Sequence, residues 1–301
     1  MKGYRMENKP KKLTKLYIII VIFLLIIALL SAFILLSFPR GDEQVSEIPD
    51  GEKYVGEKID EEIVEEPVPP VMRSRFYDLY EQNDHIIGWI RVPGTNINYP
   101  VVQGDDNLFY LHHDLDRRRS AAGTIFLYAS ADVLENNRNL SLFGHYMRNG
   151  TKFSALHNYL DIEHYRRFPI FAFDNLYEDG LYKIFSVFYM AGSSADALFY
   201  YYITADFPTD EDFAAHINQL LVRSIFITTV DVDIDDRIVI LTVCTYETYD
   251  LRLAVAGRRI RPGESLLVNT EDAILNPEPL FPQRWYNAFG GEPPAHILES
   301  L

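Results

Sequence analysis

The feature that most constrains this chain is an apolar run near its N-terminus. Residues Leu16 to Leu36 read LYIIIVIFLLIIALLSAFILL and include no charged side chain. At a rise of ~1.5 Å per residue, a helix of this length crosses a hydrocarbon core of ~30 Å. We therefore predict a transmembrane helix over residues 16–36.

The charges on either side of this run predict its orientation. Arg40 is the one basic residue between the run and an acidic stretch, so the positive-inside rule makes 1–15 a cytoplasmic tail and places the rest of the chain outside the cell. The alternative is a cleaved signal peptide, whose apolar region is shorter, about 7–15 residues, and ends in small residues. Ser31 and Ala32 lie inside the run, so we expect the helix to be retained in the cell membrane as a single pass. The basic residues before the run are Lys2, Arg5, Lys9, Lys11, Lys12 and Lys15.

The segment that follows the helix is acidic. Residues 37–71 are rich in Asp, Glu and Pro, which is typical of a solvated, self-repelling linker. A metal or partner site is the alternative, but these carboxylates have no regular spacing. We therefore predict an acidic extracellular linker over 37–71 and a globular domain from residue 72.

The globular part has the pattern of a mainly β fold. The stretch FYDLYEQNDHIIGWI suggests a short helix that leads into a strand, and Pro93 and Gly94 form a turn that joins the first two strands into a hairpin. Between the sixth and seventh strands, Thr209 can cap an amphipathic helix that most simply packs on a barrel. Its apolar face consists of Phe213, Ile217, Leu220 and Leu221. Runs rich in β-branched or aromatic residues predict eight strands, at 88–92, 97–102, 123–127, 139–144, 169–173, 181–190, 238–243 and 252–260.

The C-terminal tail differs from this pattern. Residues 263–301 contain several prolines and a Gly-Gly pair, so they are expected to form an irregular extension rather than a second domain. The globular domain is then predicted to cover 72–262.

Charge and ligand patterns exclude some functions. The formal net charge is −15, with 43 acidic against 28 basic side chains, which argues against nucleic acid as a partner. The DVDIDD segment at 231–236 lacks the Gly and Glu of a calcium loop, so a solvated turn is expected there. His112, His113 and Asp114 have no second set of ligands, and both histidines are expected to have surface or structural roles. No metal is predicted.

The chain has one cysteine, Cys244, and therefore no internal disulfide. A lone thiol in a strand is most often buried and inert, and it becomes a nucleophile only beside a base or a cation. His145 ends a predicted strand just before a polar loop, and Arg252 begins the strand after the cysteine, so a hairpin would bring it back to the thiol. A thiol, an imidazole and a fixed cation are what nucleophilic acyl transfer requires.

Several motifs in the same order resemble one family. GWIRVPGTNINYPVVQGDDNLFYLHHD, GTIFL, LFGHYMRNGTKFSAL, LTVCTYE and RLAVAGRRIRPGES are similar to class B sortases over roughly residues 76–265. The resemblance implies a membrane-anchored cysteine transpeptidase of Gram-positive bacteria. It implies an eight-stranded sortase-type β-barrel with added helices, one of them before the penultimate strand, and makes 72–262 the catalytic domain. No organic cofactor or metal is implied.

The resemblance also implies residue roles and partners. Cys244 would cleave a Thr–Gly or Thr–Asn type bond in the C-terminal sorting signal of a secreted protein and form a thioacyl enzyme. His145 would protonate the leaving amine and later deprotonate the incoming one, and Arg252 would hold the substrate backbone and stabilise the oxyanion. The acceptor would be a peptidoglycan precursor or another cell-wall amine.

Two other functions are left open by the sequence. A pilin-polymerising sortase would use a lysine amine as acceptor, and a catalytically silent sortase-like module would only bind at the surface. The family usually has Thr-Leu-x-Thr-Cys at the nucleophile, whereas this chain has Val243 before Cys244. Because the change removes a hydroxyl, we expect it to affect the sorting-signal preference rather than the reaction.

Overall fold

The computed structural model describes residues 70–134, 137–245 and 250–299. The chain divides into two compact units, and the described residues all belong to the second, Pro67–Leu301. The predicted cytoplasmic tail at 1–15, the predicted transmembrane helix at 16–36 and all but the end of the acidic linker lie outside the described residues. Within the described ranges, no helix combines the length and apolar character that a membrane span requires.

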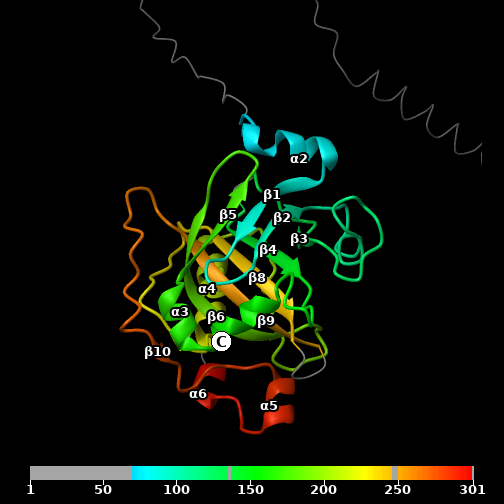
Figure 1. Ribbon diagram of the computed structural model, residues 1–301. Helices are drawn as coiled ribbons and strands as arrows, with labels where there is room; N and C mark the ends of the chain where they lie inside the picture. The colour runs from blue at the N-terminus through cyan, green and yellow to red at the C-terminus, as the bar shows by residue number, and fades with distance from the viewer. Residues whose placement is uncertain (1–69, 135–136, 246–249, 300–301) are drawn as a thin grey trace, which may run out of the picture. The chain divides into compact units, whose positions relative to one another are not determined.

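Eight strands form a closed barrel (Figure 1), in the order β1-β2-β3-β4-β8-β9-β6-β5. All eight predicted strands are present, and no end differs from its predicted position by more than two residues. Their apolar side chains fill the barrel interior in one continuous core that includes Val101, Leu142, Leu241 and Val255. The strands are β1 (Ile86–Arg91), β2 (Asn98–Val102), β3 (Ile125–Leu127), β4 (Asn139–Gly144), β5 (Ile170–Asn175), β6 (Leu181–Ala191), β8 (Ile238–Cys244) and β9 (Leu251–Arg259).

The strand β8 lies between β4 and β9, and these three strands position the site. It runs parallel to β4, with Gly144 opposite Val243, and antiparallel to β9, with Cys244 opposite Arg252. Every residue of β8 is buried except the last one. The C-terminal ends of β4 and β8 and the start of β9 therefore meet at one end of the barrel.

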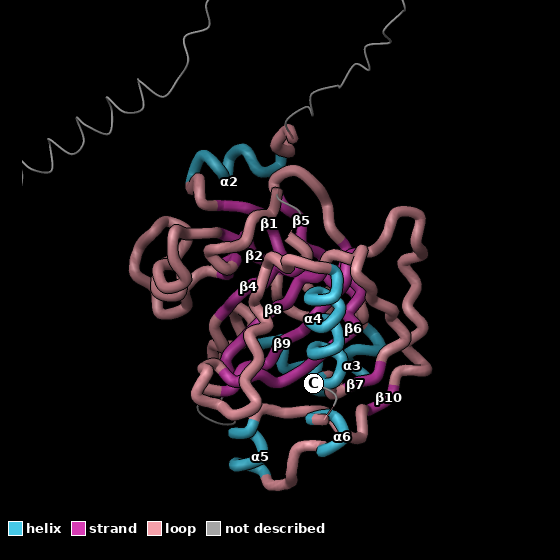
Figure 2. Tube along the Cα trace, turned by 180° about the vertical axis from the view of Figure 1, so that it is seen from behind, coloured by secondary structure: helices cyan, strands magenta, loops and turns pink. Residues whose placement is uncertain are grey.

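The helix α4 (Asp210–Arg223) covers the outer face of the barrel, against β6 (Figure 2). As predicted, Thr209 is its N-cap, and the hydroxyl accepts a hydrogen bond from the backbone N–H of Asp212 at 3.1 Å. Phe213 and Leu220 are fully buried against the barrel. Leu221, expected on the same face, is 41% exposed, because the next residue after Leu220 turns ~100° around the helix and leaves the buried stripe.

Shorter helices join the strands. The predicted N-terminal helix is present as η1 (Ser74–Phe76) followed by α2 (Tyr77–Gln82). Between β4 and β5 the chain forms two helices that the sequence did not predict, η2 (Ser154–Leu160) and α3 (Ile162–Arg167). Each is only one or two turns long, so its apolar spacing is too short to stand out.

The first hairpin closes on a glycine, as expected. Gly94 has a φ of 73°, and a Cβ at this position would come within 2.3 Å of the Phe168 ring. Both the left-handed conformation and the close approach of the ring require glycine here.

The C-terminal tail is more ordered than predicted. It contains β10 (Ile274–Leu275), which pairs with β7 (Phe226–Ile227), and two helices, α5 (Gln283–Phe289) and α6 (Ala295–Leu298). Two of the prolines that suggested irregular structure, Pro282 and Pro294, are the N-caps of these helices, where proline is tolerated because no intrahelical N–H is lost. The tail also buries Leu280 completely.

The DVDIDD segment is largely the solvated turn that the sequence suggested, with Asp231, Asp233 and Asp235 exposed, but its last residue is buried. Asp236 is 4% exposed, and its carboxylate accepts a hydrogen bond from Arg261 at 2.7 Å. Arg258 is buried in the same cluster and pairs with Glu264 at 2.5 Å. This hydrogen bond holds the pKa of Glu264 far below its usual range, with help from Lys183. The acidic segment is therefore neutralised by the end of β9.

Candidate active site

One cavity is lined by all three residues that the sequence proposed as catalytic. It has a volume of about 390 Å³ and includes His145, Cys244 and Arg252. Its walls are largely apolar, which lowers the dielectric around any charge inside it. The apolar side chains are Leu108, Leu111, Phe126, Phe143 and Ile203.

Cys244 is exposed at the end of an otherwise buried strand. The inert, buried thiol that a lone strand cysteine suggests is therefore not what the structure contains. Because β8 ends at this residue, the barrel packing stops and the side chain opens onto the cavity. An accessible thiol beside a cation is the arrangement that nucleophilic cysteines need.

Arg252 lies directly across the β8–β9 ladder from Cys244. Its guanidinium carbon is 5.8 Å from the centre of the Phe143 ring, within the range of a cation–π contact. Burial is the largest influence on its pKa and lowers it, but Tyr202, Cys244 and Asp250 together raise the pKa of Arg252 above its ordinary value. The cavity thus contains a permanent positive charge.

His145 reaches the cavity from the neighbouring strand. It follows Gly144, which is paired with Val243, so the parallel register brings the histidine beside the end of β8. Its Nε2 lies 2.7 Å from the carbonyl oxygen of Leu111. A carbonyl can only accept, so Nε2 carries a proton in this arrangement. Nδ1 is then the ring atom that can accept or release a proton in the reaction.

Thr242 is a cavity residue that the sequence analysis did not propose. Thr242 lines the cavity, because side chains two apart in a strand share a face and Cys244 is two residues further on. The same alternation could have identified it. Val243 points the other way and packs in the barrel core, 1% exposed. The departure from the family pattern at 243 therefore changes the core and not the cavity lining.

The neighbouring histidines differ in their surroundings. His113 stacks on the Phe109 ring at 4.1 Å between centroids, and its Nδ1 lies 2.7 Å from the Phe109 carbonyl oxygen, which is the structural role expected of it. The His112 ring is 6.4 Å from that of His145, at the edge of the site. Among the residues that the structure describes, no group of three His, Cys, Asp or Glu side chains could hold a metal ion.

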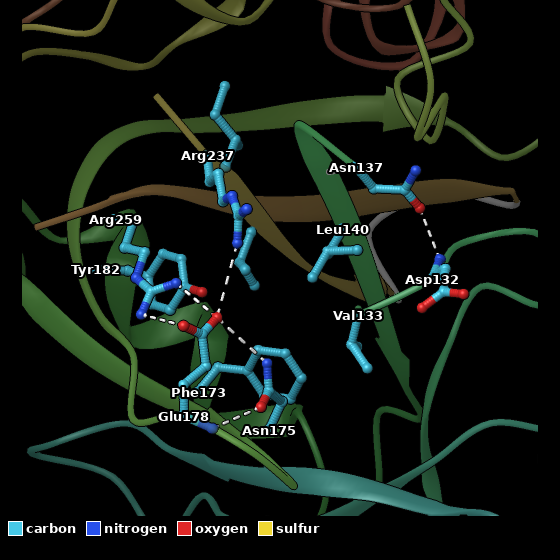
Figure 3. Close-up of a pocket in the computed structure, with 12 residues that line it drawn as sticks. Asp132, Val133, Asn137, Leu140, Phe173, Asn175, Glu178, Tyr182, Arg237 and Arg259 are labelled. Atoms are coloured by element: carbon cyan, nitrogen blue, oxygen red, sulfur yellow. Dashed lines mark hydrogen bonds and ion pairs between the residues drawn. The ribbon is translucent and has the colours of Figure 1, made fainter. Parts of the chain in front are cut away.

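Figure 3 shows a second cavity. Its lining includes Leu140, Ile238 and Val239, so it lies at the start of β4 and β8, away from the end that carries Cys244. Its volume is about 20 Å³, room for roughly one water molecule. Glu178 lies in this cavity and forms two hydrogen bonds with Arg259, at 2.6 and 2.9 Å, and the Arg237 guanidinium lies 3.7 Å from it. The charges of Glu178, Arg237 and Arg259 are therefore paired with one another. We assign these ion pairs a structural role, because they connect β9 and the start of β8 to the segment before β6.

The known proteins that resemble this chain in sequence and those that resemble it in structure agree with one another. No family model matches the chain. Sortase B of Staphylococcus aureus is 31% identical over 192 residues, which are 63% of this chain and 76% of that protein. Sortase B of Listeria monocytogenes is 31% identical over 194 residues, 63% of this chain and 75% of that protein. A structure of a Staphylococcus aureus sortase B–substrate complex superposes with a TM-score of 0.58 at 32% identity, covering 63% of this chain and 86% of that one.

The closed barrel, the exposed thiol and these relatives define the class of the protein as a cysteine transpeptidase. Within that class, the chain belongs to the class B sortases.

Proposed function

We propose that Cys244 is the nucleophile with which this sortase cuts the C-terminal sorting signal of secreted proteins. The observation that carries the proposal is that Cys244 is the only cysteine in the chain and is exposed in a cavity that it shares with His145 and Arg252. A cysteine transpeptidase with one thiol has no other candidate. The similarity to sortase B proteins, one of them solved with its substrate, supports a sorting-signal substrate.

The reaction follows from the three side chains. The thiol proton of Cys244 passes to Nδ1 of His145, and the sulfur attacks the carbonyl carbon of the scissile peptide bond. Arg252 stabilises the oxyanion that develops on the carbonyl oxygen. The C–N bond then breaks, His145 delivers its proton to the leaving amine, and a thioester remains on Cys244.

The second half of the reaction joins the substrate to an amine. The incoming amino group attacks the thioester carbon, again with Arg252 facing the oxyanion. His145 removes a proton from the attacking nitrogen and returns one to the sulfur as the C–S bond breaks. We propose an amine of the cell wall or of a peptidoglycan precursor as acceptor, and the chain's own groups suffice without a cofactor.

We also propose that the protein works outside the cell, anchored by a retained helix over 16–36. The apolar run, the basic residues of 1–15 and the acidic linker over 37–71 support this topology. Protease added to intact cells should then digest the domain at 72–262. A domain that is fully protected until the cells are lysed would contradict the topology.

The substrate and the acceptor can be identified together. Full-length protein in detergent is incubated with a peptide library in the presence of a short peptidoglycan-type amine or a lysine peptide, and the products are sequenced by mass spectrometry. Transfer to the cell-wall amine supports the proposal, whereas transfer only to lysine would indicate a pilin polymerase. The Cys244→Ala variant is the control, and cleavage by it, or no cleavage by the wild type, would contradict the proposal.

A further inference from the structure

A residue of the C-terminal tail links two carboxylates beside the active site. Arg284, in the first turn of α5, has Nε 3.1 Å from Oδ2 of Asp196 and Nη1 3.1 Å from Oδ2 of Asp250. The side chains are 20%, 1% and 22% exposed, respectively, so the pairs are shielded from water. Shielded ion pairs are screened less by salt than exposed ones and hold their geometry better.

The Asp196 end of this link is fixed. The carboxylate accepts hydrogen bonds from the backbone N–H groups of Leu198, Gln283 and Arg284, at 2.8–2.9 Å. Burial raises the pKa of Asp196, but these N–H groups and the Arg284 side chain outweigh it and lower the pKa overall. The start of α5 is therefore anchored, and the Arg284 guanidinium is presented to Asp250 from a rigid base.

The Asp250 end lies against Arg252. Asp250 precedes β9 with a φ of 59°, and its carbonyl oxygen accepts a hydrogen bond from the Gly192 N–H at 2.8 Å. A Cβ on Gly192 would sit 2.0 Å from Oδ1 of Asp250 and 3.1 Å from Nε of Arg252. The carboxylate and the guanidinium thus lie over the same glycine, which itself lines the active-site cavity.

Asp250 is thus paired with Arg284 and also lies close to Arg252. If Arg284 were absent, Asp250 could turn fully to Arg252 and form the bidentate pair that arginine and carboxylate prefer. Such a pair would occupy the fork of Arg252 and cancel the charge that a developing oxyanion needs. Arg284 is too far along the tail to be suspected from sequence motifs.

We propose that Arg284 is a positioning residue that holds the Asp250 carboxylate off Arg252, so that the Arg252 guanidinium remains available to the substrate. The inference rests on the role proposed above for Arg252. It gives the C-terminal tail a part in catalysis although none of the tail residues that the structure describes lines the active-site cavity.

The test is a double-mutant cycle in which acylation of the full-length protein is measured in detergent. The substrate is an intact sorting peptide that the wild-type protein cleaves. Arg284→Ala should lower kcat by about tenfold, less than the 10²–10³ expected for loss of an oxyanion donor, and leave KM within about twofold. In the Asp250→Asn background the same substitution should have almost no effect, because no competing carboxylate remains. Arg284→Lys should restore part of the rate.

A matched control separates positioning from general loosening of the tail. Arg166 also ties the tail to the domain, through a hydrogen bond from Nη2 to the Ala273 carbonyl at 2.8 Å, but it does not contact Asp250. Arg166→Ala should leave kcat unchanged, and thermal unfolding of each variant shows whether it is folded.

The outcomes are distinct. An unchanged kcat in Arg284→Ala, or a loss of equal size in the wild-type and Asp250→Asn backgrounds, would overturn the inference while leaving the proposed function intact. A wild-type protein that forms no acyl adduct on Cys244 would instead overturn the proposed function and the inference with it.

Discussion

At the scale of single residues, the site depends on where strands end. Cys244 is exposed because β8 stops there, and Arg252 faces it because β9 begins in register with it. His145 leaves β4 at the same level and has one ring nitrogen occupied by the Leu111 carbonyl. The barrel therefore fixes the backbone of all three residues, so that little reorganisation is needed when charge develops.

The roles of Arg252 and His145 can be separated by kinetics. Because the oxyanion forms in both half-reactions, Arg252→Ala should slow acylation and deacylation alike, by about 10²–10³. Arg252→Lys should recover only part of the rate, since an ammonium cannot reproduce the guanidinium fork. His145→Ala should remove the acid and base and so lose the wild-type pH profile.

Single-turnover rates of the three variants, measured across pH, provide the check. An altered pH profile in Arg252→Ala together with a wild-type profile in His145→Ala would mean that the two roles are reversed.

Val243 offers a prediction about the family pattern. It is buried in the core, so Val243→Thr places a hydroxyl in an apolar environment and should cost about 1–3 kcal/mol of unfolding free energy. The choice among sorting peptides should not change, because the side chain does not line the cavity. Denaturant unfolding and competition between peptides measure the two effects.

Thr242, the residue before Val243, provides the matched control for this prediction. Thr242→Val alters a residue that lines the cavity and should change peptide selectivity more than Val243→Thr does. The opposite order would show that the cavity described for the free protein is not the one that binds the peptide.

At the scale of elements, α4 carries a buried titratable group. His216 is 1% exposed, and its Nδ1 lies 2.8 Å from the Tyr200 hydroxyl, with Phe207 and Phe213 packed around the ring. Burial lowers the pKa of His216 to about 4. The neutral ring is thus favoured in the folded protein and the charged ring in the unfolded chain.

The sign of the pH effect follows from this difference. The pKa of His216 is depressed on folding, so its contribution to stability is complete above the unfolded value of about 6.5 and is lost as pH falls toward 4. The loss should approach about 3 kcal/mol at the acid end. His216→Gln cannot titrate but can still accept the Tyr200 hydrogen bond, so its stability should fall less over this range.

Urea unfolding at several pH values between 7 and 4 tests this prediction. His296→Gln, at a histidine whose side chain is 66% exposed, is the control and should keep the wild-type dependence. Equal pH dependence in wild type and His216→Gln would show that burial of this ring does not set the acid stability.

At the scale of the whole molecule, local patterns predicted the strands and α4 but not the tail. The strands are runs of β-branched and aromatic residues between turn formers, and α4 has a capping threonine and a regular apolar stripe, so both are encoded within about ten to fifteen residues. The packing of the tail depends on distant partners such as Asp196 and Asp250 for Arg284. Such pairs leave no periodic signal in the sequence.

The candidate site also combines residues that local sequence patterns predict with a contact that depends on the folded barrel. The sequence motifs, in their order, indicated His145, Cys244 and Arg252, and the predicted hairpin independently placed Arg252 beside Cys244. The structure brings all three residues to one cavity. The Leu111 carbonyl that orients His145 comes from a loop of the β2–β3 connection. Its position follows from the closed barrel and could not be derived from the residues around His145.

The central claim, that Cys244 becomes acylated during turnover, is tested most directly by intact-mass spectrometry of full-length protein mixed with a cleavable sorting peptide. We predict an adduct with the mass of the N-terminal peptide fragment, located on Cys244, absent in Cys244→Ala and discharged by an added amine. Because Cys244→Ala removes one exposed sulfur, this variant should unfold at nearly the wild-type temperature. Peptide cleavage without an adduct, together with near-wild-type turnover by folded Cys244→Ala, would contradict the claim.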